Sequence, residues 1–354
     1  MDFVHTEDRR MLADSLRRYL HDQYPAELRN EVAYTAPYHA PDKYQELAEL
    51  GILSALVTPE HGGFGGAGFD ISVVFEELGR NLCAEPLLPA LLGLKLAQQF
   101  AQTELINAVV SGTSKIALAV FEPGNSDDLS ALTTTATGDG DSWQLHGQKS
   151  VVYGAPQADQ FLVAARTDAG IGLFLTDAGQ VEGYAMADGG GAGEVRFDNA
   201  AASCLASEAS QEIAAALDLG RLALCAEAVG AMDVLHSMTV DYLKQRQQFG
   251  QPIAIFQALQ HRIVDMAIEI EQSRSITILA ASKIGTEEQA EYVAMAKNLI
   301  GRAATLVAEE ATQLHGGIGM TWEYAGAHYC KRLIMLDHQL GDRLQQLHRL
   351  LAVA

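Results

Sequence analysis

The spacing of apolar side chains divides the chain into three stretches. In residues 6–22, leucines and a tyrosine recur at helical spacing behind Thr6, a residue suited to an N-cap, and two acidic residues suited to a first turn. Two further helices are expected, from Asp42 to Gly51 and from Asp70 to about Gly79. The first third of the chain is therefore predicted to be helical.

The pattern changes near Lys115. Short runs rich in Val, Leu, Phe and Thr follow, separated by Gly and Asp: IALAVF, WQLHG, QFLVAAR, GLFLT and GEVRF. Such runs are typical of β-strands. Turn dipeptides such as Asp139-Gly140, with no helical stretch between the runs, predict an antiparallel sheet or a small barrel that ends near Leu205.

Residues 206–354 return to long stretches rich in Ala, Leu and Ile with helical periodicity, which predict a bundle of four or five helices. The chain is therefore expected to be an α+β protein with three domains. These are an N-terminal helical domain in residues 1–115, a middle antiparallel β domain in residues 116–205 and a C-terminal helical bundle in residues 206–354.

Composition and charge narrow the class of protein. Apolar residues make up 48% and charged residues 19%, which is typical of a globular chain. The formal net charge of -21 opposes binding to nucleic acid and to anionic membranes, because both require an excess of Lys and Arg. No apolar run reaches the roughly 18 residues of a membrane span, and the first residues, MDFVHTEDRRM, do not resemble a leader. A cytoplasmic location is therefore expected.

The cysteines and histidines do not predict a metal site. Cys83, Cys204, Cys225 and Cys330 stand far apart, with neither CxxC spacing nor a Cys/His ligand pattern, and the histidines are scattered. We expect reduced thiols, as in a cytosolic protein, rather than disulfides or zinc ligands.

The segment YLKQRQQFGQPIAIFQALQHRIVDM, residues 242–266, holds the most specific pattern of the chain. It can be interpreted as a boundary between two helices. A helix then ends near Arg246, Gly250 caps it, Pro252 prevents its continuation and a new helix starts near Phe256.

The residues around this turn also suit a phosphate site. Arg246 can make two charge-assisted hydrogen bonds to a pyrophosphate, and Phe249 beside it could cover an adenine or a ribose. Gln257 adds a further polar group. The residues alone leave both interpretations open.

Two motifs resemble those of the acyl-CoA dehydrogenase family. Residues 246–266 are similar to its signature RxxFGxPIxxFQxxxHxxADM, with Val264 in the place of the Ala. Residues 313–323, QLHGGIGMTWE, resemble its QxHGGxGxTxE element, although Gly316 and Gly317 would also suit a plain helix C-cap. Helix, sheet, helix is also the family's domain order, so the resemblance covers essentially the whole chain.

In this family the two elements reach an FAD that a neighbouring subunit mainly holds. The resemblance implies that six residues contact the diphosphate and adenosine end of that FAD: Arg246, Phe249, Gln257, Gln313, Gly316 and Gly317. Glycine matters there because a side chain would keep backbone N–H groups from the ligand. The implied substrate is an acyl-CoA, and the implied electron acceptor is an electron-transfer flavoprotein.

The family's positions that face the flavin ring are degraded in this chain. The family has a TEPGxGSD loop and a WITN strand, whereas this sequence reads FEPGNSDD in residues 121–128 and KSVVYGA in residues 149–155. Val151 stands where the Trp is expected, and Tyr153 replaces the Thr. Loss of hydrogen-bond donors there would weaken or retune flavin binding, unless other residues compensate.

The family's catalytic Glu is missing from both of its usual places. This carboxylate removes the α-proton of the acyl thioester while the β-hydrogen leaves as hydride. The LER-like triplet reads LGR in residues 219–221, and the YEGT-like turn reads QLGD in residues 339–342. Asp218 and Asp342 are shorter and out of register, and they better suit a solvated helix face and a turn cap. No catalytic residue is therefore assigned.

This combination resembles the degraded subunit of an α2β2 acyl-CoA dehydrogenase, above all the small subunit of the pimeloyl-CoA type, and also the steroid side-chain type. We expect Arg246 and Gln313 to complete the FAD site of a partner that supplies the Glu. Two alternatives stay open: a homotetrameric dehydrogenase with a displaced base, and a cofactor-free scaffold. Dispersed apolar side chains line acyl pockets, so the sequence does not identify the acyl group.

Overall fold

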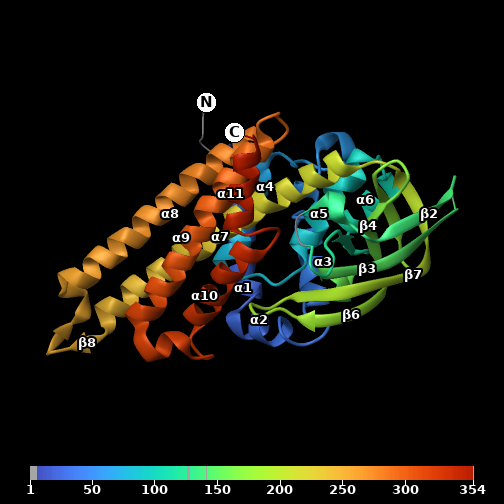
Figure 1. Cartoon of the computed structure of the whole chain (residues 1–354). Coiled ribbons are helices and arrows are strands. Elements are labelled where there is room, and N and C mark those ends of the chain that lie inside the picture. The colour runs from blue at the N-terminus through green and yellow to red at the C-terminus, as the bar shows by residue number, and fades with distance from the viewer. Residues whose placement is uncertain (1–5, 126–127, 141, 354) are drawn as a thin grey trace. The chain divides into compact units, whose positions relative to one another are not determined.

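The computed structural model describes residues 6–125, 128–140 and 142–353 (Figure 1). It divides into two compact units: one contains residues 1–26, 68–83 and 221–354, and the other contains residues 27–67 and 84–220. The predicted order of helices, sheet and helices is confirmed. The domain limits near residues 115 and 205 stay a prediction.

The first unit is helical. Thr6 caps α1 as predicted, because its Oγ1 accepts a hydrogen bond from the N–H of Arg9 at 3.4 Å. Five α-helices follow residue 206 in the described part of the chain, which confirms the predicted bundle. The helices that contribute to this unit are α1 (Glu7–Gln23), α4 (Gly68–Arg80), α7 (Ser210–Gln245, from residue 221 on), α8 (Gln257–Lys283), α9 (Gln289–His315), α10 (Ala325–His338) and α11 (Arg343–Val353).

Helices α4 and α7 cross at two glycines. A Cβ atom on Gly79 would lie 2.0 Å from the carbonyl oxygen of Glu227, and one on Gly230 would lie 2.0 Å from that of Glu76. Such distances are far below van der Waals contact, so only glycine fits at either position. The two helix backbones therefore touch directly at this crossing.

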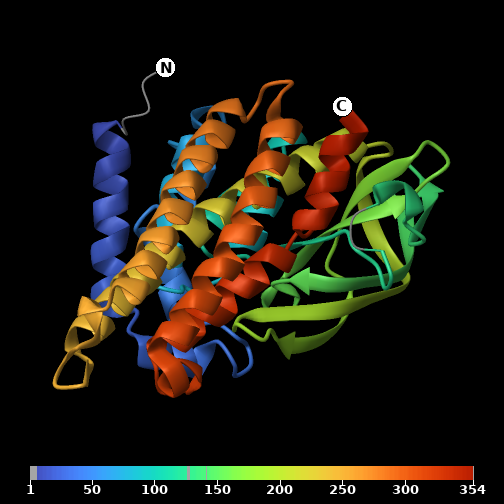
Figure 2. The ribbon, with the colours of Figure 1, turned by 60° about the vertical axis from the view of Figure 1, so that its left-hand side comes forward.

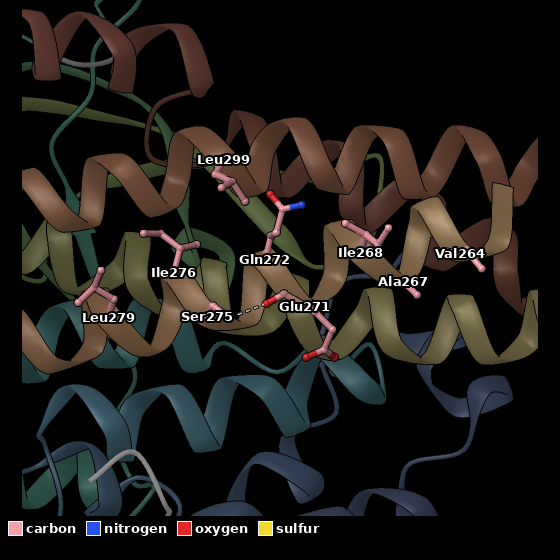
Figure 3. Close-up of a pocket in the computed structure, with 9 residues that line it drawn as sticks. All are labelled: Val264, Ala267, Ile268, Glu271, Gln272, Ser275, Ile276, Leu279 and Leu299. Atoms are coloured by element: carbon pink, nitrogen blue, oxygen red, sulfur yellow. Dashed lines mark hydrogen bonds between the residues drawn. The ribbon is translucent and has the colours of Figure 1, made fainter. Parts of the chain in front are cut away.

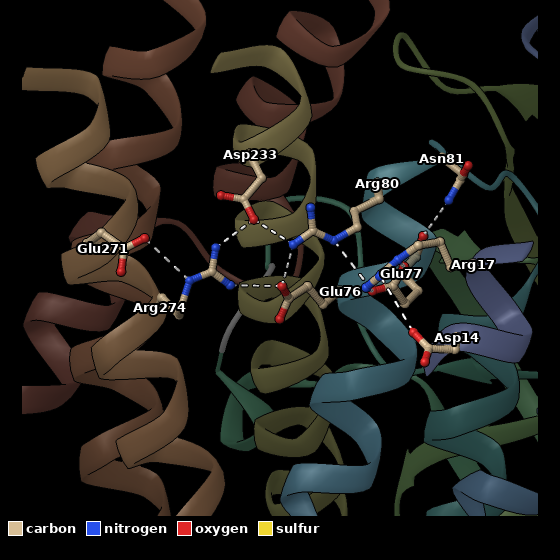
Figure 4. A network of polar contacts seen from close by, with 9 residues as sticks. All are labelled: Asp14, Arg17, Glu76, Glu77, Arg80, Asn81, Asp233, Glu271 and Arg274. Atoms are coloured by element: carbon tan, nitrogen blue, oxygen red, sulfur yellow. Dashed lines mark hydrogen bonds and ion pairs between the residues drawn. The ribbon is translucent and has the colours of Figure 1, made fainter. Parts of the chain in front are cut away.

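Ion pairs join four helices of the same unit (Figure 4). Arg80 on α4 and Arg274 on α8 each donate to Glu76 on α4 at 2.8 Å and to Asp233 on α7 at 2.6 Å. Helix α1 joins the network through Arg17, which binds the next glutamate of α4. Each carboxylate thus holds two guanidinium groups, which couples the packing of α4, α7 and α8.

The second unit contains a sheet in the order β1-β4-β2-β3-β7-β5, with β6 paired to β7. Because β5 pairs again with β4, the strands close into a small barrel, one of the two predicted forms. The strands are β1 (Ile116–Ala119), β2 (Thr135–Asp139), β3 (Ser142–Tyr153), β4 (Gln160–Arg166), β5 (Ile171–Thr176), β6 (Gln180–Ala185) and β7 (Gly191–Ala206).

The pairing is mixed rather than purely antiparallel. Strand β4 runs parallel to β1 and, at one residue pair, to β2, whereas the remaining pairs are antiparallel. The reason is the turn Ala155–Gln157 after β3, which carries the chain to β1 instead of folding it back on β3. Turn dipeptides alone do not reveal such a crossover.

The barrel encloses its own apolar core. Large apolar side chains from β3, β4, β5 and β7 fill it: Leu145, Val152, Phe161, Val163, Phe174, Val195 and Phe197. The helices of this unit are α2 (Ala26–Val32), α3 (Pro41–Glu49), α5 (Leu87–Gln99) and α6 (Thr103–Val110), together with the start of α7. Of the helices described, none combines the length and apolarity that crossing a membrane requires.

Candidate functional site

A β-hairpin joins α7 to α8 and carries the first motif. Helix α7 ends at Gln245, and β8 (Gln247–Gln248) pairs with β9 (Gln251–Pro252). The two turn residues, Phe249 and Gly250, have φ values of 55° and 77°, as a two-residue hairpin turn with both φ positive requires. The prediction that Gly250 caps the helix is therefore wrong, because cross-strand pairing places this glycine in the hairpin turn.

The first motif presents its side chains to solvent. Phe249 is 88% exposed and lies in the left-handed region of φ, which is strained for an aromatic residue. Arg246 is exposed, and its guanidinium has no hydrogen bond or ion pair with any residue that the structure describes. Gln257, the first residue of α8, is exposed too. This chain thus leaves a cation, a phenyl ring and an amide uncovered at one end of the bundle.

The second motif ends α9 and opens a glycine turn, η6 (Gly316–Met320). Gly316 is the C-cap of α9 with φ 66°, and its N–H donates to the carbonyls of Thr312 and Gln313, so the helix-cap interpretation is correct. A Cβ atom on Gly316 or Gly317 would meet no described atom within 4 Å. Gln313 is exposed on the last turn of α9. The backbone of this turn is consequently accessible to a ligand.

An aromatic stack brings the two motifs together. The imidazole of His315 lies between Tyr242 on α7 and Tyr324, with ring centroids 4.5 and 4.7 Å away. Its Nδ1 lies 2.8 Å from the carbonyl of Ala311, and its Nε2 contacts the hydroxyl of Tyr324. Burial lowers the pKa of His315, which favours the neutral ring that this pairing requires. The hairpin and η6 therefore lie at the same end of the bundle (Figures 1 and 2).

Sequence reasoning missed the two tyrosines of this stack. The signal was weak: Tyr242 stands one helical turn before Arg246, and Tyr324 directly follows the second motif. Their packing on His315 fixes the end of α7 against the end of α9. The uncovered guanidinium, phenyl ring and open glycine backbone fit the diphosphate and adenosine end of a dinucleotide.

The FEPGNSDD loop is tied into the barrel unit by Glu122. This buried carboxylate accepts hydrogen bonds from Lys149 Nζ at 2.8 Å, from the N–H and hydroxyl of Thr133 at 2.6 and 2.7 Å, and from the N–H of Thr134 at 2.9 Å. Burial alone would raise the pKa of Glu122, but these donors outweigh it and hold the pKa at about 2. Ser126 and Asp127 of this loop lie outside the described residues.

The ring-facing strand does not offer the contacts that the family resemblance implies. Val151 has φ 50°, unusual for a β-branched residue, and lies in a β-bulge of β3. Glu194 on β7 accepts hydrogen bonds from the N–H of Val151 at 3.3 Å, the hydroxyl of Ser150 at 3.0 Å and that of Tyr184 at 3.2 Å. The hydrogen-bond donors of this bulge are thus bonded to Glu194, a carboxylate of the chain itself. The described ring-facing residues do not fit an isoalloxazine, so no catalytic step is derived on them.

Two buried cations hold the last turn of α10 and the turn that follows it, which is one of the two places where the family has its catalytic Glu. Lys297 on α9 donates to the carbonyls of Leu336 and Asp337 at 2.6 and 2.7 Å, and Arg221 donates to the carbonyl of Leu340 at 2.7 Å. Burial lowers the pKa of Lys297 to about 8. Leu340 itself is buried, so an apolar side chain stands at this position of the turn.

Asp342 has a structural role in this turn. Its Oδ1 accepts hydrogen bonds from the N–H groups of Leu344 and Gln345 at 2.8 and 2.9 Å, and Gln345 Oε1 accepts from the N–H of Asp342 at 2.8 Å. This reciprocal pair is a capping box at the start of α11, as the turn-cap interpretation predicted. For Asp218 the prediction of a solvated helix face is wrong, because the chain buries this residue on α7.

Models of one family match the chain in three consecutive segments. The N-terminal domain of acyl-CoA dehydrogenases matches residues 6–109, the middle domain residues 117–199 and the C-terminal domain residues 210–338. Among curated relatives, acyl-CoA dehydrogenase IpdE2 of Mycolicibacterium smegmatis is 28% identical over 349 residues, which covers 98% of each chain.

Solved structures share the whole architecture. A chain of the ChsE4-ChsE5 complex from Mycobacterium tuberculosis superimposes with a TM-score of 0.90 at 25% identity, covering 99% of this chain and 98% of that chain. A variant of the Tcur3481-Tcur3483 steroid ACAD gives a TM-score of 0.89 at 29% identity, covering 98% and 97%.

Proposed function

Because the chain belongs to the acyl-CoA dehydrogenase family, whose members depend on FAD, we propose that it is a subunit that completes the FAD site of a second acyl-CoA dehydrogenase chain. The substrate of the assembly is then an acyl-CoA, dehydrogenated between its α and β carbons, and its electron acceptor is an electron-transfer flavoprotein. The similarity to a chain of the ChsE4-ChsE5 complex supports a mixed assembly.

One observation carries this proposal. Phe249 stands almost fully exposed on a strained backbone, beside a guanidinium that the described residues leave unpaired. Strain of this kind persists where a function requires it, and a phenyl ring that is 88% exposed contributes little hydrophobic stabilisation to the lone chain. A ligand held by another subunit would cover both groups.

Each residue of the hairpin end then has a distinct task. Arg246 neutralises the diphosphate with its two-pronged guanidinium, and Phe249 covers the adenosine. Gln257 and Gln313 donate amide hydrogen bonds, and the glycine turn at Gly316 admits the ligand to the backbone. A bound FAD would supply the acceptor for the β-hydride.

We further propose that this chain lacks the catalytic base and that the partner supplies it. A base requires a carboxylate within hydrogen-bond reach of the α-proton. The two family positions hold Gly220 and the buried Leu340, and Asp342 already caps a helix through both of its backbone contacts. A homotetrameric dehydrogenase would need a base within this chain, and neither family position supplies one.

Flavin content tests the proposal. The chain is expressed alone and together with its genomic neighbour, and flavin absorbance and acyl-CoA dehydrogenation are measured on both preparations. We expect a yellow, active complex and an inactive lone chain. Full activity of the lone chain would show that it carries its own base. A complex without flavin would show that the chain is a cofactor-free scaffold.

Two variants test whether Arg246 binds FAD in the complex. Arg246→Ala removes charge-assisted hydrogen bonds, each worth about 1.5–3 kcal/mol, so FAD affinity should fall about tenfold or more. Lys244→Ala removes the same charge two residues away, on an exposed side chain outside the motif, and should leave the affinity unchanged. Equal effects of the two variants on FAD affinity would contradict a specific contact between Arg246 and FAD.

A further inference from the structure

One buried histidine lies where three segments meet at the end of the bundle that carries the hairpin. His315, the last residue of α9, is 4% exposed. Its ring packs against Tyr242 of α7, whose carbonyl accepts a hydrogen bond from the N–H of Arg246 at 2.8 Å. A Cβ atom on Gly319 of η6 would lie 3.0 Å from the Cβ of His315, so the glycine turn also packs on this residue. Displacement of the imidazole would therefore shift Arg246 and the glycine turn relative to each other.

The two hydrogen bonds of this imidazole determine where its proton lies. Its Nδ1 is 2.8 Å from the carbonyl oxygen of Ala311, which can only accept, so Nδ1 carries a hydrogen. Burial lowers the pKa of His315 and favours the neutral ring, which leaves Nε2 as an acceptor. The hydroxyl of Tyr324 contacts Nε2 and is therefore the donor. Burial raises the pKa of Tyr324 to about 12, so this donor keeps its proton.

A glycine makes room for the ring of Tyr324. A Cβ atom on Gly326 would lie 2.3 Å from Cε1 of Tyr324 and 3.0 Å from its hydroxyl oxygen, well below van der Waals contact. Gly326 lies in α10 and does not have a positive φ, so its backbone conformation does not itself require glycine. The missing side chain at this position thus serves the placement of the tyrosine ring against His315.

We propose that Tyr324 is a positioning residue for the FAD contacts: its hydroxyl holds His315 in the neutral Nδ1–H tautomer that connects α7 to the glycine turn, and protonation of His315 weakens this connection. The inference rests on the proposed function, because FAD affinity is the quantity that the connection affects. A second proton on the imidazole would lie on Nε2 and face the proton of the tyrosine hydroxyl. The hydroxyl would then have to rotate and accept, and its own proton would lose its partner in a half-buried site.

The direction of the pH dependence follows from this exchange. Because the pKa of His315 is lowered in the folded chain, the neutral contact persists above the ordinary histidine value of about 6.5. It is lost as the pH falls below that value and the ring takes up its second proton. FAD affinity should therefore be highest at neutral pH and should decrease on acidification.

The other titratable groups around this ring do not change charge in the same pH range. Tyr242 faces it from α7 and Tyr324 from the segment before α10, and Cys330 of α10 lies near Tyr324. Phenols and thiols titrate well above pH 6.5, and burial raises the pKa of the Cys330 thiol further. The glycine turn, GGIGM in residues 316–320, carries no titratable side chain. A pH dependence that requires the hydroxyl of Tyr324 is therefore attributable to His315.

The test compares FAD affinity of the purified complex with and without Tyr324→Phe. This variant keeps the aromatic ring but removes the donor to Nε2. At about pH 7.5 we expect FAD affinity to fall about three- to tenfold, which corresponds to one neutral hydrogen bond. The difference should shrink toward about pH 5, because protonation then removes the same hydrogen bond from the wild type. A difference that does not change with pH, or no difference, would overturn the proposal.

Two control variants remove a hydroxyl elsewhere in the same helical unit. Tyr292→Phe makes the same chemical change in the first turn of α9, at the opposite end of this helix from His315. Ser275→Ala removes a hydroxyl that donates to the carbonyl of Glu271 at 2.8 Å, in the open groove along the middle of α8 (Figure 3). Both controls should match the wild type in FAD affinity at every pH. A pH-dependent loss in either control would contradict a specific role of Tyr324.

Nuclear magnetic resonance provides a second measurement on the full-length chain without flavin. Chemical shifts of the ring nitrogens in isotopically labelled histidine identify the tautomer, and His315→Gln assigns the signal. We expect the Nδ1–H tautomer at neutral pH and a titration that moves to higher pH in Tyr324→Phe, because the hydrogen bond to the neutral ring is lost. Gly326→Ala should act in the same direction by displacing the tyrosine ring. An Nε2–H tautomer, or an unchanged titration in Tyr324→Phe, would overturn the proposal.

Arg246→Ala distinguishes failure of this inference from failure of the proposed function. It should lower FAD affinity at every pH and leave the titration of His315 unchanged. If Arg246→Ala lowers the affinity but Tyr324→Phe has no pH-dependent effect, the positioning role alone is wrong. If Arg246→Ala has no effect on affinity while His315 titrates as expected, the proposed FAD contact is wrong and the tautomer assignment stands.

Discussion

The ion pair between Glu227 on α7 and Arg332 on α10 provides a quantitative test of the helical unit. Arg332 Nε and Nη2 donate to the two carboxylate oxygens at 2.6 and 2.7 Å, and the side chains are 6% and 15% exposed. Arg332 Nη1 also donates to Gln339 Oε1 at 3.1 Å. The pair therefore supports the segment that leads into the turn after α10.

Breaking this pair should be costly because it strands a charge away from water. Loss of one partner of a buried, two-pronged pair costs about 3–5 kcal/mol. Arg332 keeps its contact with Gln339, so we expect Glu227→Ala to destabilise the unit by about 3 kcal/mol. Glu227→Gln retains one acceptor oxygen and should cost about half of that.

Chemical denaturation followed by circular dichroism measures these values, and a double-mutant cycle isolates the pair. The variants Glu227→Met and Arg332→Met are compared with the double variant. Because the double variant leaves no charge unpaired, it should be more stable than the sum of the single effects predicts, by about 2 kcal/mol or more. Additive effects, or a cost of Glu227→Ala below about 1 kcal/mol, would show that solvent screens the pair and would refute this reasoning.

Three further predictions follow from contacts described above. Asp233→Asn weakens the hydrogen bonds of both Arg80 and Arg274 and should lower the free energy of unfolding by about 1–2 kcal/mol. Because these side chains are partly exposed, added salt should reduce the difference in stability between variant and wild type. A difference that does not change with salt would contradict this prediction. Glu122 has a pKa of about 2 in the folded chain against 4.5 in the unfolded chain, so its stabilising effect is present above pH 4.5 and is lost as pH falls toward 2. Acid titration of Glu122→Gln should lack this loss, and an identical acid profile would argue against the assignment. Asp342→Ala should lower the free energy of unfolding by about 1 kcal/mol because it removes the cap on α11, whereas Asp342→Asn should retain most of that stability. Both variants should keep the activity of the complex. If Asp342 were the catalytic base, both variants would lose activity.

The helices and most strands follow from the sequence because local rules determine them. Thr6 caps α1, and the strand runs fall on β1, β3, β4, β5 and β7. The sequence pattern did not reveal β2 and β6, whose residues are mostly exposed and carry little apolar periodicity. The parallel pairing of β1 with β4 depends on a crossover between distant segments, which no local pattern encodes.

The candidate site was predicted in part. The motifs gave the residues of the hairpin and the glycine turn, and the structure brings these two segments together. Their role in binding FAD stays a proposal. Gly250 was misplaced because a glycine after a helix suits a cap and a hairpin turn equally, and only the pairing of Gln247 with Pro252 distinguishes them. The contacts of Glu194 with β3 depend on the register between β3 and β7, which the sequence does not show.

The close approach of α4 to α7 at Gly79 and at Gly230 limits how this protein can be divided. The stretch of α7 that follows residue 221 presents a flat backbone surface at Gly230, and the complementary surface belongs to α4, encoded more than a hundred residues earlier. A fragment that begins after the barrel would therefore expose this surface to water, along with the ion pairs that α4 provides. The C-terminal helices consequently depend on residues 68–83 for their packing, and truncation experiments on this chain should keep that helix.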